Sequence, residues 1–225
     1  MLPSGFPQQQ GLYDPTFEKD ACGVGFVVNI KGRQSHTIVR HAMQVLVNLN
    51  HRGACGCEAN TGDGAGINMQ LPDKFLRKAA AAIGCELPPP GEYGVGMVFL
   101  PKDAAQRALF EAEFAQIVAE EGQTLLGWRT VPTDNRSLGA TAIAGEPFVR
   151  QVFIGCNATA LIGNDPLAFE RKLYVIRKRA ERAIRYSDAG ESGREQGSRF
   201  YIASLSSRTI VYKGMLLADQ VDAYY

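Results

Sequence analysis

The spacing of apolar residues restricts the fold of this chain more than any other feature, because segments with the strand period of two alternate with segments of helical period. A strand is predicted over residues 22–30, where apolar side chains recur at every second position from Val24 to Ile30. A helix is expected to follow from an N-cap at Ser35 and to end near Gly53. The order strand, helix, strand, helix, strand continues along the chain and predicts a mixture of helices and strands.

Further elements are predicted from the same signals. They are, in chain order, a strand over 67–71, a helix over 72–82 that stops at Gly84, a strand over 93–100, a helix over 102–121 that stops at Gly122, strands over 124–131 and 147–155, a helix over 165–186, a hairpin of 200–205 with 209–212, and a final helix from Leu216. The polar stretch 187–198 is expected to be a loop. In the helix over 102–121, the inward stripe is expected to include Leu109 and Phe114.

Cys22 opens the first predicted strand and is the strongest candidate for a reactive residue. If the peptide before it were cut, the thiol would be the nucleophile and the new α-amine, with an ordinary pKa of about 7.7 to 8, would serve as its base. Gly23 and Gly25 keep side chains away from the face that a substrate would approach. The alternative is a buried structural cysteine, since free Cys packs as a small hydrophobic residue.

Residues 1–21 show neither helical nor strand periodicity and are rich in proline, glycine and glutamine. This composition predicts an exposed leader, which would have to be removed after Ala21 for Cys22 to gain a free amine. An ordinary frayed N-terminus is the alternative.

Three short patterns after the first predicted helix allow more than one interpretation. Arg52, at the helix end, either compensates the helix dipole or points a donor back toward the first strand. Cys55 and Cys57 with His51 do not make a convincing metal site, because a structural zinc site needs four ligands and no second pair exists. The glycine-rich run 62–66 leads into a strand and lacks a P-loop lysine, which favours a tight loop lying close to another segment over a phosphate cradle.

The composition is that of an ordinary globular protein and selects no macromolecular partner. The formal net charge is +1, and no apolar stretch approaches the roughly 20 residues of a membrane helix. The five cysteines follow no regular framework and no secretory leader is visible, which predicts a reducing, cytoplasm-like compartment. The arginine-rich helix over 165–186 could contact nucleic acid, but a solvated face or packing against a neighbouring acidic domain is the favoured interpretation.

Three stretches taken together resemble the beginning of the glutamate synthase large subunits. They are Lys19–Phe26, His51–Ala54 and Thr61–Gly66, and the later segments 127–132, 176–179 and 204–215 agree with the same family. The resemblance runs from Tyr13 to the end of the chain.

The resemblance implies a leader over 1–21 and a class II glutamine amidotransferase domain over 22–225. The implied fold class is α+β, an N-terminal-nucleophile (Ntn) hydrolase-like four-layer α/β/β/α sandwich. The domain is expected to be incomplete, because the family's glutamine-binding and oxyanion-hole segments correspond to positions beyond Tyr225. Cys22 would form a thioester with glutamine and release ammonia, while Arg52 and Gly23 would support the nucleophile.

The resemblance also implies the partners of such a domain. L-Glutamine would be the substrate, and the remaining domains of the full enzyme would pass ammonia to 2-oxoglutarate with NADPH, NADH or ferredoxin as electron donor. No metal or cofactor is expected in this chain, whereas FMN and an iron–sulfur cluster are implied for the full-length enzyme. The implied location is the cytoplasm, or a plastid in a eukaryote, with no nucleic-acid or membrane partner. The alternative function is a non-catalytic fragment or interaction module that lacks the glutamine pocket.

Overall fold

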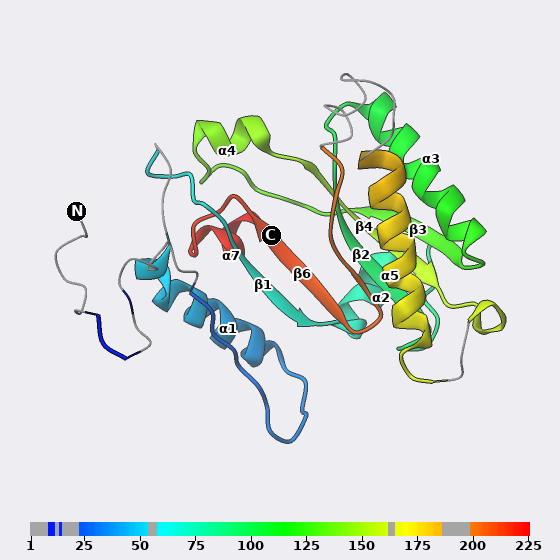
Figure 1. Ribbon diagram of the computed structural model, residues 1–225, viewed down its shortest axis with the longest axis horizontal. Coiled ribbons are helices and arrows are strands. Elements are labelled where there is room, and N and C mark those ends of the chain that lie inside the picture. The colour runs from blue at the N-terminus through cyan, green and yellow to red at the C-terminus, as the bar shows by residue number, and fades with distance from the viewer. Residues whose placement is uncertain (1–8, 12–13, 15–22, 54–57, 162–164, 186–198) are drawn as a thin grey trace.

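The computed structural model describes residues 9–11, 14, 23–53, 58–161, 165–185 and 199–225. Its largest element is an antiparallel sheet of four strands in the order β3-β4-β2-β5 (Figure 1). The strands are β2 (Tyr93–Leu100), β3 (Thr124–Thr130), β4 (Phe148–Gly155) and β5 (Tyr201–Ser206). β2 is buried along almost its whole length, because it is a central strand with both faces covered.

Two long helices cover one face of this sheet. α3 (Ala104–Glu120) begins at Asp103, whose carboxylate accepts a hydrogen bond from the Gln106 amide at 2.8 Å, and α5 (Ala168–Ala180) continues into a π-helical turn over Glu181–Arg185. The helices lie side by side (Figure 1). Phe114 from α3 and Leu173 from α5 meet the sheet in one apolar cluster with Val98 and Ile154.

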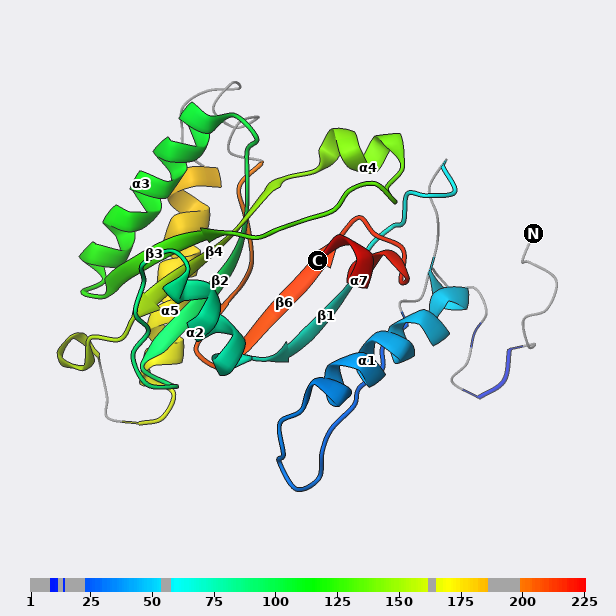
Figure 2. The same cartoon turned by 180° about the vertical axis from the view of Figure 1, so that it is seen from behind.

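A second antiparallel sheet faces the other side of the first. It pairs β1 (Ala65–Gln70) with β6 (Thr209–Gly214). A second apolar cluster joins Met97 and Phe153 of the large sheet to Ile210 of β6 and to Leu76 of α2 (Asp73–Ala81). Figure 2 shows α2 on the side of the large sheet opposite to α5. The helices α3 and α5, the four-stranded sheet and the two-stranded sheet therefore lie in successive layers, in the order expected for the sandwich. The α+β class is confirmed.

The helix predicted after Ser35 is present as α1 (His36–Asn48), followed by a single 3-10 turn over Asn50–Arg52. α1 adjoins β1, and its Met43 and Leu46 pack against the apolar cluster that contains Leu216. None of its residues is fully buried. The helix is thus held by one partly covered apolar stripe.

The strand predicted over residues 22–30 is not formed over 23–30, and Cys22 lies outside the described residues. This segment runs beside α1 without pairing to either sheet (Figure 1). Its alternating side chains, Val24, Phe26, Val28 and Ile30, are 68 to 98% exposed. The alternation is a property of the sequence alone, whereas a strand also needs hydrogen bonds to a neighbouring strand, and this segment is paired with none of the described strands.

The prediction of a hairpin around residues 206–208 is also wrong. β5 and β6 are consecutive, but β5 pairs with β2 and β6 pairs with β1. The link between them is fixed to α5, because the Glu170 carboxylate accepts hydrogen bonds from the Ser207 amide at 2.5 Å and from the Ser206 hydroxyl at 3.1 Å. The chain therefore passes from one sheet to the other at this turn.

The remaining elements are short. α4 (Ala140–Gly145) was not predicted, the 3-10 turn Ala158–Ala160 follows β4, and α7 (Gln220–Tyr224) forms the last predicted helix. The polar stretch predicted as a loop over 187–198 lies outside the described residues. In the described part of the chain, no helix combines the length and apolar character needed to cross a bilayer.

Candidate active site

The sequence predicts a site formed by Cys22, Gly23 and Arg52, and the structure describes only part of it. Cys22 lies outside the described residues, as does the leader 1–21 apart from residues 9–11 and 14. Gly23 is partly buried and begins the extended segment beside α1, and Arg52 ends the 3-10 turn after α1. His51, just before it, places its ring Nδ1 3.0 Å from the Asn48 carbonyl oxygen.

Glu58 is the polar centre of the loop that follows. Its carboxylate accepts hydrogen bonds from the Thr61 hydroxyl at 2.8 Å, from the Thr141 amide at 3.1 Å and from the Thr141 hydroxyl at 3.0 Å. The Thr141 amide, followed by the two hydroxyl donors, lowers the pKa of Glu58. An ionised Glu58 therefore ties the loop to the first turn of α4, where backbone amides are otherwise unpaired.

Two glycines let the backbone segments of this region come close together. A Cβ at Gly62 would lie 2.3 Å from the Leu216 carbonyl oxygen, and a Cβ at Gly139 would lie 2.3 Å from the Thr61 hydroxyl oxygen and 2.4 Å from Glu58 Oε2. The Gly139 amide also donates to the Asn60 carbonyl at 2.9 Å. The prediction of a tight loop against another segment is confirmed at Gly62, whereas Ala65 and Gly66, at the end of the glycine-rich run 62–66, already belong to β1.

Gln220 fixes the same loop from the other side. Its side chain is only 5% exposed; the amide nitrogen donates to the carbonyls of Asn60 at 3.0 Å and Ser137 at 2.7 Å, and the amide oxygen accepts from the Leu217 amide at 2.8 Å. One buried side chain thus joins the segments before β1, before α4 and before α7. These three hydrogen bonds make Gln220 a structural residue of the loop.

Sequence reasoning missed Glu58, Thr141 and Gln220 as parts of this region. Glu58 lies only three residues before Thr61, but Thr141 and Gln220 come from segments far away in the sequence. A single glutamine in a short C-terminal helix gives no pattern that would reveal its buried contacts. Only Gly139, which precedes the first turn of α4, offered a local signal for a helix start.

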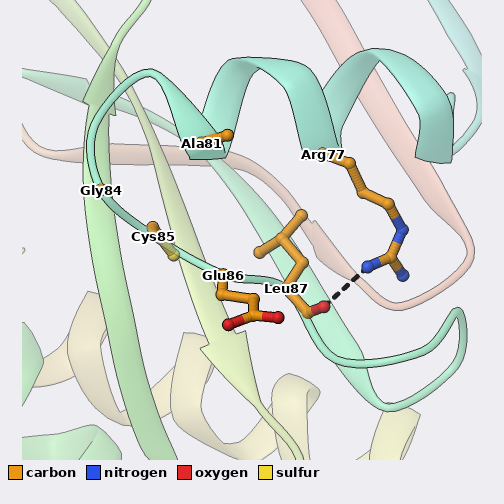
Figure 3. A pocket seen from close by; sticks show the side chains of 6 residues that line it. All are labelled: Arg77, Ala81, Gly84, Cys85, Glu86 and Leu87. Carbon is orange, nitrogen blue, oxygen red and sulfur yellow. Dashed lines mark hydrogen bonds between the residues drawn. The ribbon is translucent and has the colours of Figure 1, made fainter.

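A cavity of about 340 Å³ near α2 holds one of the described cysteines (Figure 3). Cys85 lies at its wall, and burial raises the pKa of its thiol. The Arg77 guanidinium donates hydrogen bonds to the carbonyl oxygens of Leu87 at 2.6 Å and Pro88 at 2.5 Å, and it pairs with the Asp73 carboxylate at 3.0 Å. Because a protonated thiol is not an activated nucleophile, and Arg77 is held by two carbonyls and a carboxylate, these contacts are structural.

The sequence argues against a metal site at His51, Cys55 and Cys57, and of these residues the structure describes only His51. Within the described ranges, no group of three or more His, Cys, Asp and Glu side chains is placed to hold a metal ion. The described free cysteines are Cys85 and Cys156, and burial is the main cause that raises the pKa of both thiols. This part of the chain therefore does not fit an iron–sulfur cluster, which needs several thiolates.

The loop from Glu58 to Gly64, before β1, is suited to hold neighbouring segments in place. Its Glu58 carboxylate is occupied by internal hydrogen bonds and is therefore not free to act as a general base in this arrangement. The chemistry predicted for an N-terminal cysteine needs no such base, because its own α-amine serves. The contribution that this loop can make is to hold the neighbouring segments in position.

Comparison with known proteins identifies the relatives of the chain. It is 48% identical over 219 residues to the glutamate synthase [NADPH] large chain of Bacillus subtilis (strain 168), covering 97% of this chain and 14% of the relative. It is 43% identical over 222 residues to the glutamate synthase [NADH] of Schizosaccharomyces pombe, covering 97% of this chain and 10% of the relative. The ferredoxin-dependent glutamate synthase 2 of Synechocystis is 34% identical over 208 residues, with 92% of this chain and 12% of the relative covered.

The chain thus spans between a tenth and a seventh of the length of these relatives. A comparison with protein families matches residues 22–225 to the family described as glutamine amidotransferases class-II. The match begins at Cys22 and includes both sheets and all the described helices. The chain belongs to the class-II glutamine amidotransferases, and its relatives are glutamate synthases.

Proposed function

We propose that this chain is the glutaminase part of a glutamate synthase and that Cys22 is its nucleophile once residues 1–21 have been removed. The single observation that carries the proposal is the family match over residues 22–225, which starts at a cysteine. A cysteine exposed in this way combines nucleophile and base in one residue. The proposed domain therefore includes residues 22–225 and is preceded by a leader over 1–21.

The proposed reaction has two steps. The Cys22 sulfur attacks the side-chain amide carbon of L-glutamine, the carbon–nitrogen bond breaks, and ammonia leaves with the proton that the α-amine took from the thiol. Water then attacks the thioester carbon, the carbon–sulfur bond breaks, and glutamate and the free thiol are released. Gly23 and Arg52 are proposed to support the nucleophile without taking part in bond changes.

In the longer protein, the ammonia is proposed to reach 2-oxoglutarate in other domains. The names of the relatives include NADPH, NADH and ferredoxin forms, so the electron donor of this protein is left open among the three. FMN and an iron–sulfur cluster are proposed to belong to those other domains. A reducing cytoplasmic or plastid location suits an unpaired catalytic thiol.

Replacement of the nucleophile gives the direct test. In the complete protein, Cys22→Ala should abolish ammonia release from glutamine while the far-ultraviolet circular dichroism spectrum is unchanged. Cys156→Ala is the matched control, since it removes a different thiol and should keep the activity. Unchanged ammonia release from the Cys22→Ala protein would exclude the proposal.

An intact mass spectrum tests whether the 225-residue chain itself carries a usable nucleophile. After incubation with a glutamine-like electrophile, we expect a mass that begins at Cys22 and carries one adduct, which Cys22→Ala loses. A mass that retains residues 1–21 and no adduct would favour the alternative of a non-catalytic interaction module. That alternative is supported by the exposed apolar side chains between Val24 and Ile30.

A further inference from the structure

A cavity of about 440 Å³ lies where the ends of the two sheets approach α4 and α7. Its walls come from the end of β2, from α4, from the start of β5, from the end of β6 and from α7, all of which are labelled in Figure 1 except β5. This volume is within the range of pockets that bind small organic molecules. The charges and apolar surfaces of its wall indicate which kind of molecule would fit.

Glu146 is the only acidic side chain among the described residues that line the cavity, and hydrogen-bond donors surround its carboxylate. It accepts hydrogen bonds from Lys102 Nζ at 2.8 Å, from Asn135 Nδ2 at 3.0 Å and from the Tyr224 hydroxyl at 3.0 Å. Burial opposes its ionisation, but the three donors outweigh burial and lower the pKa of Glu146. Glu146 and Lys102 therefore neutralise each other.

Two further cations line the cavity without an opposing carboxylate. Lys213 Nζ donates to the Tyr201 hydroxyl at 2.6 Å and lies 4.4 Å from the centroid of the same ring. No carboxylate of the described residues pairs with Lys213, and Arg199, two residues before Tyr201, has no hydrogen-bond or ionic partner in the described part of the chain. The side chains of the lining thus carry an excess of two positive charges, Lys213 and Arg199, beside the Tyr201 phenol, and this excess favours an anionic ligand.

The rest of the wall is apolar or aromatic. Leu138 and Leu216 line one part, and the rings of Tyr224 and Tyr225 meet edge to face with their centroids 4.8 Å apart. Tyr225 is held in place because its hydroxyl donates to the Lys213 carbonyl at 2.8 Å. An inorganic anion would leave these surfaces hydrated, whereas a ligand with an apolar body would cover them.

We propose that this cavity binds a small organic carboxylate with an aromatic or aliphatic body, whose carboxylate group is held by Lys213 and Arg199. The body of the ligand lies against Leu138, Leu216 and the Tyr224–Tyr225 pair. The proposal uses no group of the predicted glutaminase site, so it stands or fails independently of Cys22.

The test uses 3-phenylpropionate as the probe and isothermal titration calorimetry on the 225-residue chain at low salt. We expect saturable binding of 3-phenylpropionate and none of the neutral 3-phenylpropionamide. Lys213→Met and Arg199→Gln should each weaken binding by about tenfold or more, which corresponds to the loss of one charge-assisted contact. Lys213→Arg should retain binding, and Lys74→Gln, which removes an exposed cation of α2 outside the cavity, should leave it unchanged.

Thermal unfolding of each variant is measured in parallel, so that a loss of binding is counted only where the melting transition is kept. Equal binding of the acid and the amide would overturn the proposal, as would unchanged affinity in Lys213→Met. Displacement of 3-phenylpropionate by an equal concentration of inorganic phosphate would show that the cavity selects small anions in general, and would overturn the organic carboxylate as its ligand.

Discussion

Gly62 illustrates how much of the candidate site depends on single residues. It is buried in the loop before β1, and its α-carbon faces the backbone of Leu216 and Leu217. Any side chain at this position would enter space that another backbone segment already fills. Because a backbone carbonyl cannot rotate away as a side chain can, the loop or the start of α7 would have to move.

We expect Gly62→Ala to lower the free energy of unfolding by about 1–3 kcal/mol, the usual cost of overpacking. The measurement is urea denaturation followed by circular dichroism. Gly145→Ala is the matched control, because a Cβ there would meet nothing within 4 Å and the backbone of α4 accepts alanine. Equal stability of the two variants would contradict the close approach described for Gly62.

At the level of elements, the basic helix α5 is explained by its neighbour α3. Lys172 lies 2.8 Å from Glu121 with both side chains about 15% exposed, and Arg179 reaches both Glu120 and Glu121. Lys178 and Arg177 pair with Glu181 on the same helix. The sequence favours a solvated face or packing against a neighbouring acidic domain, whereas the structure pairs these cations with carboxylates of this chain, at the end of α3 and in the turn after α5.

Lys172→Met should lower the free energy of unfolding by roughly 1–2 kcal/mol, between the values for exposed and buried ion pairs, because Glu121 keeps only Arg179 as its partner. Arg182→Gln, at an exposed position just after α5, should change it by about 0.5 kcal/mol or less. Both variants are compared by urea denaturation at low and at high salt. A Lys172→Met protein as stable as Arg182→Gln would show that the pair contributes nothing.

At the level of the whole molecule, the sheets and helices bury three apolar clusters, while the side chains of Val24, Phe26, Val28 and Ile30 lie outside all three. The segment from Gly23 to Ile30 touches α1, where a Cβ at Gly25 would meet a Val45 methyl at 2.4 Å. Its alternating side chains face solvent over a stretch long enough to form an apolar patch. Patches of this kind on a soluble protein mark surfaces that associate with other surfaces.

The 225-residue chain should therefore bind a hydrophobic dye such as 8-anilinonaphthalene-1-sulfonate in its folded state. Phe26→Ser combined with Val28→Thr should lower the dye fluorescence without lowering the melting temperature, since neither side chain is packed in the core. Leu109→Ser is the matched control, because Leu109 of α3 is a single exposed apolar residue, 69% exposed. Equal fluorescence of the parent and the double variant would place the dye elsewhere.

Much of the local structure could be predicted from the sequence. β2 has the predicted bounds, α1 begins after Ser35, and α3 ends before Gly122, whose φ of +72° suits glycine. The close approach at Gly62 was also expected. These features depend on neighbours in the sequence, where periodicity and backbone preference act directly. The roles of Cys22, Gly23 and Arg52 stay predictions.

The sequence by itself therefore determined the family, the α+β class and most helices and strands, because the order of motifs and the spacing of apolar residues depend on residues that are close together in the sequence. Tertiary structure alone decided which strands pair, that residues 23–30 stay outside both sheets, and that Leu109 faces solvent. It also joined Glu58 to Thr141 and Gln220 to Asn60. The physical reason is that pairing and burial depend on which distant segment supplies hydrogen-bond donors, acceptors and apolar surface, and no local period encodes that choice.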